Sequence, residues 1–277
     1  MTVRTAINIE KGQMLTIPYS ARENLAGTLQ RLVSTEEVAH FQCRCDRCRD
    51  PTELDTFISA VKCLKPTCHG YLLPLDPTNP DSVWKCRRIL SENDLESSSP
   101  SCGSPVPVRK IVSILYKAEE DLKNVKKIIP ADGRNNSNDG KVDLNYLRMM
   151  ELKKMWEGEI FHENHYLVQE ISLIIVKYLA NYLDTLSKDE LEFFISCCER
   201  LLTVADVITP GLSPHRTMLQ FYLARGLKSL LVFSHGSNNG DSSHEACLSS
   251  DDNVTRLTQN RLKSFQENFI LLSNKDE

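Results

Sequence analysis

The sequence predicts a mainly α protein, in which a C-terminal antiparallel helical array follows a small N-terminal region of irregular and β structure stapled by zinc. Two observations predict this fold class. Seven of the ten cysteines fall between Cys43 and Cys102, and eight of the twelve prolines fall between Pro51 and Pro107. From about residue 108 onwards, apolar residues recur three and four positions apart, which is the period of an amphipathic helix.

Composition places the chain among globular proteins. Of its 277 residues, 41% are hydrophobic and 25% are charged, so a wholly disordered, collagen-like or coiled-coil chain is not expected. The net charge of −4 offers no global basic field for nucleic acid or an anionic membrane. No apolar run reaches the roughly 18 residues that span a bilayer, and no signal-peptide pattern opens the sequence. We expect a monomer with reduced thiols, in the nucleus and/or the cytoplasm.

Residues 1–20 are expected to form the end of a sheet. Apolar residues alternate with polar ones on both sides of a Lys11-Gly12 turn, which predicts two short strands. A strand pair of this size is not stable alone in water, so its partners must lie elsewhere. Residues 21–110 are expected to hold little regular structure, with metal substituting for a core.

Helices are predicted through the rest of the chain. Their expected ranges are Val108 to Ile129, Leu144 to Trp156, His165 to Leu183, a fourth helix from Ser187 to about Ile208, a fifth from Pro214 to about Phe233, and Val254 to Leu272. Ser187 and Glu190 form a capping box, and Pro210-Gly211 ends the fourth helix. Short connections between antiparallel helices predict a TPR-like array of two-helix units.

Three cysteines within six residues form the first candidate metal site: Cys43, Cys45 and Cys48. Thiolates suit Zn²⁺, which takes four tetrahedral ligands in structural sites, so a fourth ligand must come from elsewhere. The alternatives are a fortuitous cluster of surface cysteines and a redox CxxC site. The redox site is disfavoured because its usual βαβ setting is missing.

Four further cysteines form the second candidate zinc site: Cys63, Cys68, Cys86 and Cys102. An ordinary zinc ribbon would place its last ligand at position 89, which is Ile89. Removing the polar residues 89–101 restores the knuckle Cys-Arg-Arg-Cys-Gly, so we interpret this stretch as an insertion between two ligands. Lengthening the loop costs roughly 2 kcal/mol, well below the ~10–16 kcal/mol that structural zinc contributes in small domains.

The histidines have weaker metal-site patterns. His69 is a spare donor next to Cys68, although an exposed histidine is the better interpretation. His162 and His165 lie three residues apart and could share one face of a helix as ligands. We favour a structural role in capping and packing for this pair.

Several motifs together resemble the SET and MYND domain (SMYD) family of protein-lysine methyltransferases, in its arthropod-specific branch. The segment from Arg4 to Tyr19 resembles the GEELT-x-x-Y end of a SET domain. Phe41 with the three cysteines that follow is similar to a post-SET zinc segment. The run Asp50-Pro-Thr-Glu-Leu54, and Cys198-Glu-Arg with the later Pro210-Gly, resemble further segments of the family.

The resemblance implies a division of the chain and a set of roles. The segments are 1–20 as the end of SET, 21–50 as post-SET, 51–107 as a zinc-ribbon-like segment with insertion 89–101, and 108–277 as the helical C-terminal domain. Tyr19 matches the active-site tyrosine that orients the lysine amine. Phe41 matches the aromatic that packs on the adenine of S-adenosylmethionine; a small-core phenylalanine is the alternative. The implied substrates are lysines of histones or other proteins, with a role in transcription regulation.

The sequence also departs from the family pattern. The family's Gly-rich cofactor strand, its Asn-His-Ser-Cys segment and its MYND module all lie upstream of the tyrosine that Tyr19 matches, and this sequence contains none of them. The Asn-His-Ser-Cys segment supplies the fourth post-SET ligand, so His40, Cys197 or Cys198 would have to replace it. We therefore expect a truncated chain that lacks the cofactor-binding half. The alternative is a non-catalytic zinc-binding helical scaffold that binds a protein partner.

Overall fold

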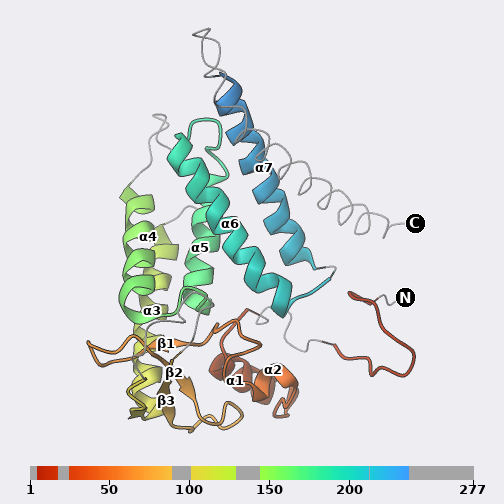
Figure 1. The fold of residues 1–277 in the computed structure, drawn as a ribbon, viewed down its shortest axis with the longest axis vertical. Coiled ribbons are helices and arrows are strands. Elements are labelled where there is room, and N and C mark those ends of the chain that lie inside the picture. Colours follow the sequence, from red (N-terminus) through yellow and green to blue (C-terminus); the bar gives the residue numbers. More distant parts are fainter. Residues whose placement is uncertain (1–4, 18–24, 89–100, 129–143, 212, 237–277) are drawn as a thin grey trace. The chain divides into compact units, whose positions relative to one another are not determined.

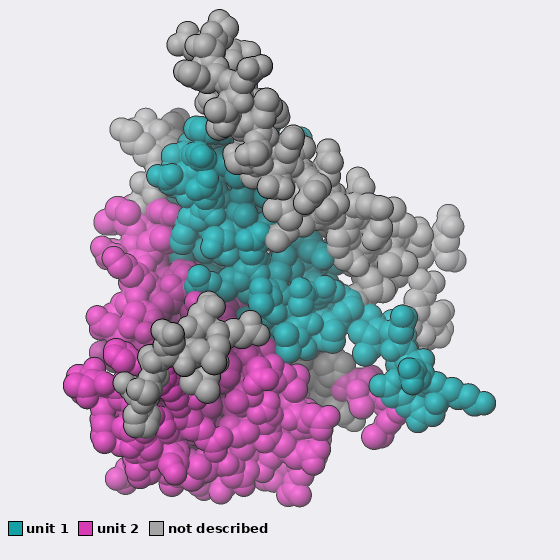
Figure 2. All heavy atoms as spheres, in the orientation of Figure 1, with its two compact units in different colours: residues 1–13, 130–142, 172–277 teal, residues 14–129, 143–171 magenta. Residues whose placement is uncertain are grey.

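The computed structural model describes residues 5–17, 25–88, 101–128, 144–211 and 213–236 (Figure 1). The chain divides into two compact units (Figure 2). Unit 1 comprises residues 1–13, 130–142 and 172–277, and unit 2 comprises residues 14–129 and 143–171. The protein is mainly helical and carries one small sheet, as the sequence predicts. No helix in the described ranges is long and apolar enough to cross a membrane.

Unit 2 contains a four-stranded antiparallel sheet in sequential order. Its strands are β1 (Val61–Lys62), β2 (Tyr71–Pro74), β3 (Trp84–Arg87) and β4 (Pro105–Val106). Burial alternates along β3, where Trp84 and Cys86 face inwards and Lys85 and Arg87 face solvent. Residues 25–88 and 101–110 thus contain more regular structure than the sequence predicted. Strands of two to four residues are too short to show a period, so pattern reading does not find them.

Two helices precede the sheet, α1 (Thr28–Ala39) and α2 (Asp46–Arg49). The sequence did not predict α1. Its buried side chains follow helical spacing, but three of the four are polar: Thr28, Arg31, Leu32 and Thr35. A helix that buries a polar stripe carries little hydrophobic signal. It ends at His40, which adopts the left-handed conformation with φ of 56°.

The predicted helices of the middle of the chain are present. They are α3 (Val108–Ile128), α4 (Leu144–Met155), a π-helical turn η1 (Trp156–Ile160) and α5 (Tyr166–Leu179), which crosses from unit 2 into unit 1. The predicted apolar stripe of α3 is largely buried, including Ile111, Leu115 and Leu122. Helix α5 ends at Leu179, earlier than the predicted Leu183.

Unit 1 is built on the pair α6 (Lys188–Ile208) and α7 (Pro214–Gly236), which lie side by side (Figure 1). The predicted capping box is confirmed. The Ser187 amide donates to the Glu190 carboxylate over 2.8 Å, and the Glu190 amide donates to Ser187 Oγ over 3.4 Å. The polar stretches 130–141 and 237–252 and the predicted helix Val254 to Leu272 lie outside the described residues.

The N-terminal segment differs from its prediction. The Lys11-Gly12 turn is present, with φ of 91° at Gly12 and the Gln13 amide donating to Glu10 O over 3.1 Å. Within residues 5–17, however, no strand forms. Met14 and Ile17 are exposed there. An isolated strand pair gains too little from its own hydrogen bonds to persist without a sheet to join.

Candidate metal centres

The structure brings together the four cysteines that the sequence groups as one split site. We call this set the four-cysteine cluster: Cys63, Cys68, Cys86 and Cys102. The Sγ atoms of Cys63 and Cys102 lie 3.5 Å apart, and those of Cys68 and Cys86 lie 3.6 Å apart. Tetrahedral Zn–S bonds of ~2.3 Å place sulfurs about 3.8 Å apart, whereas a disulfide joins them at about 2.05 Å. The spacing therefore suits four thiolates around one zinc ion.

Short loops at the ends of the strands position these sulfurs. The Cys63 amide donates to Gly70 O over 2.9 Å, which closes the turn between β1 and β2. The Cys86 amide donates to Ser104 O over 3.0 Å, which brings the segment containing Cys102 beside β3. The ligands of one site thus come from both sides of the predicted insertion, most of which lies outside the described residues.

Hydrogen bonds stabilise the ionised form of two of these sulfurs, those of Cys68 and Cys102. The Gly70 amide lowers the pKa of Cys68. The hydroxyl and the amide of Ser104 lower the pKa of Cys102 to about 6. Burial and the neighbouring thiols raise the pKa of Cys86. Zinc bound at these four cysteines would replace their thiol protons.

Gly70 has a steric role that the sequence analysis missed. A Cβ at this position would lie 2.5 Å from Cys86 Sγ and 2.9 Å from Arg87 O. Only glycine lets the turn approach the ligand on β3 this closely. The sequence signal that could have identified this role is the position of Gly70, two residues after the candidate ligand Cys68.

The second group is the three-cysteine cluster: Cys43, Cys45 and Cys48. Its ligand atoms lie within 4.8 Å of one another, and no other His, Cys, Asp or Glu of the described ranges joins them. His40 is therefore not a fourth ligand in this structure. Cys197 and Cys198 are buried on α6, as expected of structural thiols.

The three thiols have different environments. Cys45 is exposed at the N-terminus of α2, whereas Cys48 is buried. Burial raises the pKa of Cys48 to about 11. Burial also opposes ionisation of Cys45, but the amide and side chain of Cys48 overcome it and lower the pKa of Cys45. Such a group matches one face of a tetrahedral zinc centre.

The buried carboxylate of Glu53 is linked to the three-cysteine cluster through Arg31. Glu53 has no exposed surface and accepts hydrogen bonds from Arg31, from Arg47 over 3.0 Å, from Thr28 Oγ1 over 2.6 Å and from Ser59. Burial alone would raise the pKa of Glu53, but the two guanidinium groups lower it below its usual value. The sequence analysis recognised Glu53 only as part of a family motif and did not predict this network.

The backbone that carries Glu53 is strained. Four non-glycine residues of the segment 53–57 have positive φ between 52° and 61°: Glu53, Leu54, Asp55 and Phe57. This conformation costs roughly 1–2 kcal/mol per residue for side chains other than glycine. Asp50 supports the turn by accepting from the Leu54 amide over 2.7 Å. The bonds to Glu53 help to offset the strain.

The remaining predicted site residues are not part of a metal cluster. Tyr19 lies outside the described residues. Phe41 is partly buried, and its amide donates to Thr35 O over 3.5 Å. Their catalytic and cofactor roles stay predictions. His69 is exposed and lies outside the four-cysteine cluster.

His162 and His165 have the structural role that we favoured. The Nδ1 atoms accept backbone amides, from Asn164 over 3.1 Å and from Leu167 over 3.3 Å. The His165 ring is fully buried and stacks on Phe161 with centroids 3.9 Å apart. Burial lowers the pKa of His162 to about 4, so the ring is neutral at physiological pH.

Comparisons with known proteins identify relatives for one part of the chain. The chain is 36% identical over 91 residues to the SET domain-containing protein SmydA-8, isoform A, of Drosophila melanogaster, which is 33% of this chain and 19% of that protein. Isoform B is 35% identical over 85 residues, or 31% of this chain and 18% of that isoform. No protein-family model matches the chain. No solved structure matches it. The matched segment spans about a fifth of the length of these curated relatives, and it supports a relationship to SET domain-containing proteins of the SMYD type.

Proposed function

We propose that this chain acts within a SMYD-like, S-adenosylmethionine-dependent protein-lysine methyltransferase, in which zinc ions at both cysteine clusters hold unit 2 together. The observation that carries the zinc part is the convergence of four thiol sulfurs at tetrahedral spacing. The similarity to SmydA-8 supports the methyltransferase part. Four thiolates leave no open position on zinc, so the four-cysteine site has a structural role.

The catalytic assignments within this proposal come from the resemblance. Tyr19 would orient the lysine amine towards the methyl group, and Phe41 would pack on the adenine of the cofactor. Methyl transfer needs little beyond such positioning, because the sulfonium methyl of S-adenosylmethionine is already activated. The substrate would be a lysine of a histone or another protein, in the nucleus or the cytoplasm.

The metal content of the purified chain tests the zinc part. We expect about two zinc ions per chain, one for each cluster, by elemental mass spectrometry. A chain that binds no zinc would contradict the proposal at both clusters. Isothermal titration with S-adenosylmethionine tests the enzymatic part. Saturable binding that weakens in the Phe41→Ala variant would support the assignment of Phe41 and would overturn the expected lack of the cofactor-binding half. A zinc-loaded chain that does not bind S-adenosylmethionine would favour the scaffold described next.

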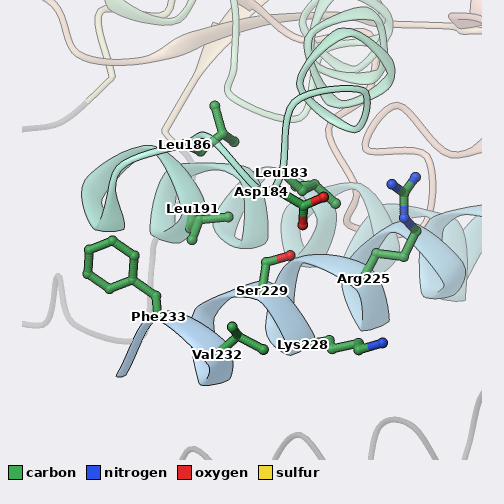
Figure 3. Close-up of a pocket in the computed structure, with 9 residues that line it drawn as sticks. All are labelled: Leu183, Asp184, Leu186, Leu191, Arg225, Lys228, Ser229, Val232 and Phe233. Carbon is green, nitrogen blue, oxygen red and sulfur yellow. The ribbon is translucent and has the colours of Figure 1, made fainter. Parts of the chain in front are cut away.

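The second candidate is a scaffold that binds a protein partner. It is favoured by a cleft of about 290 Å³ in unit 1, between α7 and the start of α6 (Figure 3). Leu186, Leu191 and Phe233 line its apolar part, and the basic residues Arg225 and Lys228 lie towards the other end. The acidic Asp184 also lines the cleft, so the lining carries two basic groups and one acidic group. Arg225 also donates to Ala180 O over 2.9 Å, which holds it in place.

This lining suits a peptide that carries apolar and acidic side chains. A fluorescent peptide of that composition should bind with an affinity that falls in Lys228→Glu and at high salt, because the charges are exposed to screening. Binding of this peptide without binding of S-adenosylmethionine would favour the scaffold over the enzyme. An unchanged affinity in Lys228→Glu would contradict a role for this cleft.

A further inference from the structure

The Arg31 side chain lies between the buried carboxylate of Glu53 and the three-cysteine cluster. Its side chain is only 8% exposed. One terminal nitrogen donates to Glu53 and to Ala26 O over 2.8 Å, and the other, Nη2, lies 3.7 Å from Cys48 Sγ. A single guanidinium therefore bridges the carboxylate and a candidate zinc ligand.

The charges of the two groups are complementary. Three thiolates around a divalent zinc ion carry one net negative charge. Glu53 with Arg31 and Arg47 carries one net positive charge, and this group is largely buried. An uncompensated charge in a buried setting is costly, so each group stabilises the other.

We propose that Arg31 is the charge partner of the anionic group that the three thiolates form with zinc, and that Glu53 positions Arg31. The inference rests on the zinc binding proposed above and adds the residue that determines the affinity of this cluster. The planar guanidinium group of arginine suits this bridging role, because its two terminal nitrogens contact two different acceptors at once. Residues behind metal ligands commonly change metal affinity by 10–100-fold.

Arg47 offers a matched comparison within the same network. It donates to the same Glu53 carboxylate oxygen, over 3.0 Å, and to Ala26 O over 3.1 Å. Arg49 on α2 provides a surface control, since its side chain is exposed and its ion pair with the exposed Asp46 is open to solvent. Both buried arginines support Glu53, Arg31 adds the contact between Nη2 and Cys48 Sγ, and Arg49 reports the effect of a surface charge.

The experiment measures zinc retention at each cluster in the full chain. Zinc-loaded protein is incubated with increasing concentrations of a chelator, freed thiols are alkylated, and peptide mass spectrometry assigns them to one cluster or the other. Arg31→Met should weaken zinc binding at the three-cysteine cluster by about 10–100-fold while the four-cysteine cluster stays protected. Arg31→Lys should retain part of the affinity, Arg47→Met should lose less than Arg31→Met, and Arg49→Ala should match the wild type.

Several results would overturn the inference. An Arg31→Met chain that retains zinc like the wild type would show that the contact to Cys48 has no effect. Loss of both clusters together in Arg31→Met would assign Arg31 to folding alone, and so would an Arg31→Met chain that loses no more affinity at the three-cysteine cluster than Arg47→Met. If the three cysteines are alkylated freely in the wild type while the other four are protected, the proposed zinc site itself fails and the inference fails with it.

Discussion

Cys63 and Cys102 stand 39 residues apart in the sequence, yet their Sγ atoms lie 3.5 Å apart. Strands β2 and β3 and the segment 89–100 lie between them in the sequence, and Cys102 stands just before β4. The sheet is small, with edge strands of two residues, so hydrogen bonds between strands contribute little stability of their own. A zinc ion held by these cysteines would therefore link segments that the strands alone connect weakly.

The proximity of Cys63 and Cys102 predicts how serine substitutions in the four-cysteine cluster change the zinc content. Cys102→Ser should lower the zinc content by about one ion per chain, as Cys86→Ser should, because both remove one of four ligands. Cys247→Ser is the control and should leave the zinc content unchanged. Elemental mass spectrometry of the three purified variants measures the effect. Full zinc content in Cys102→Ser would show that the insertion interpretation is wrong.

Gly70 provides a steric test of the same site. Gly70→Ala would place a methyl group 2.5 Å from Cys86 Sγ and so force a ligand away from its position. We expect weaker zinc binding at the four-cysteine cluster and intact binding at the three-cysteine cluster, measured by chelator competition with thiol alkylation. Gly158→Ala is the matched control, because a Cβ there would contact nothing within 4 Å. Equal zinc retention in both variants would contradict the steric role.

Glu53 predicts a dependence of stability on pH. The neighbouring arginines depress the pKa of Glu53 below the usual 4.5, so its stabilising effect is present above that value and is lost as the pH falls towards the folded-state pKa. Glu53→Gln should lower the free energy of unfolding by about 3–5 kcal/mol at neutral pH, because two buried arginines lose their partner. The difference between the two proteins should shrink as the pH is lowered to about 4 or below.

Urea unfolding followed by circular dichroism, at fixed zinc concentration, measures this difference. Loss of metal at acid pH affects both proteins, and the comparison at each pH therefore isolates Glu53. Arg49→Ala serves as a control for a surface charge of the same region. A difference that stays constant or grows on acidification would contradict the network.

A substitution of Gly226 on α7 tests how closely α6 and α7 pack in unit 1. A Cβ at this position would lie 2.6 Å from Cδ1 of the buried Phe194 and 3.2 Å from Ile195. Gly226→Ala should therefore lower the free energy of unfolding by about 1–3 kcal/mol through overpacking between α6 and α7. Gly158→Ala should show no such loss and can gain up to ~1 kcal/mol from helix propensity. Thermal unfolding of both variants provides the measurement, and a stable Gly226→Ala would contradict the close approach.

Several features could be predicted from local sequence signals. The helices α3 and α5 follow from apolar spacing, and the start of α6 follows from Ser187 and Glu190. The grouping of Cys102 with three distant cysteines followed from the knuckle that remains when residues 89–101 are removed. The helix signals depend on side chains that are close in sequence. The cysteine grouping depends on the fact that a structural zinc ion takes four ligands.

Other features depend on segments that meet only in the folded chain. Helix α1 buries Thr28 and Arg31 because Glu53, many residues later, supplies their partner. The left-handed turn at Glu53 is tolerated because the same contacts offset its strain. By itself, the sequence determined the helical class, the capping box and the cysteine sets. The tertiary structure decided which buried charges face the zinc ligands, since a polar residue is buried only where donors and acceptors from distant segments satisfy it.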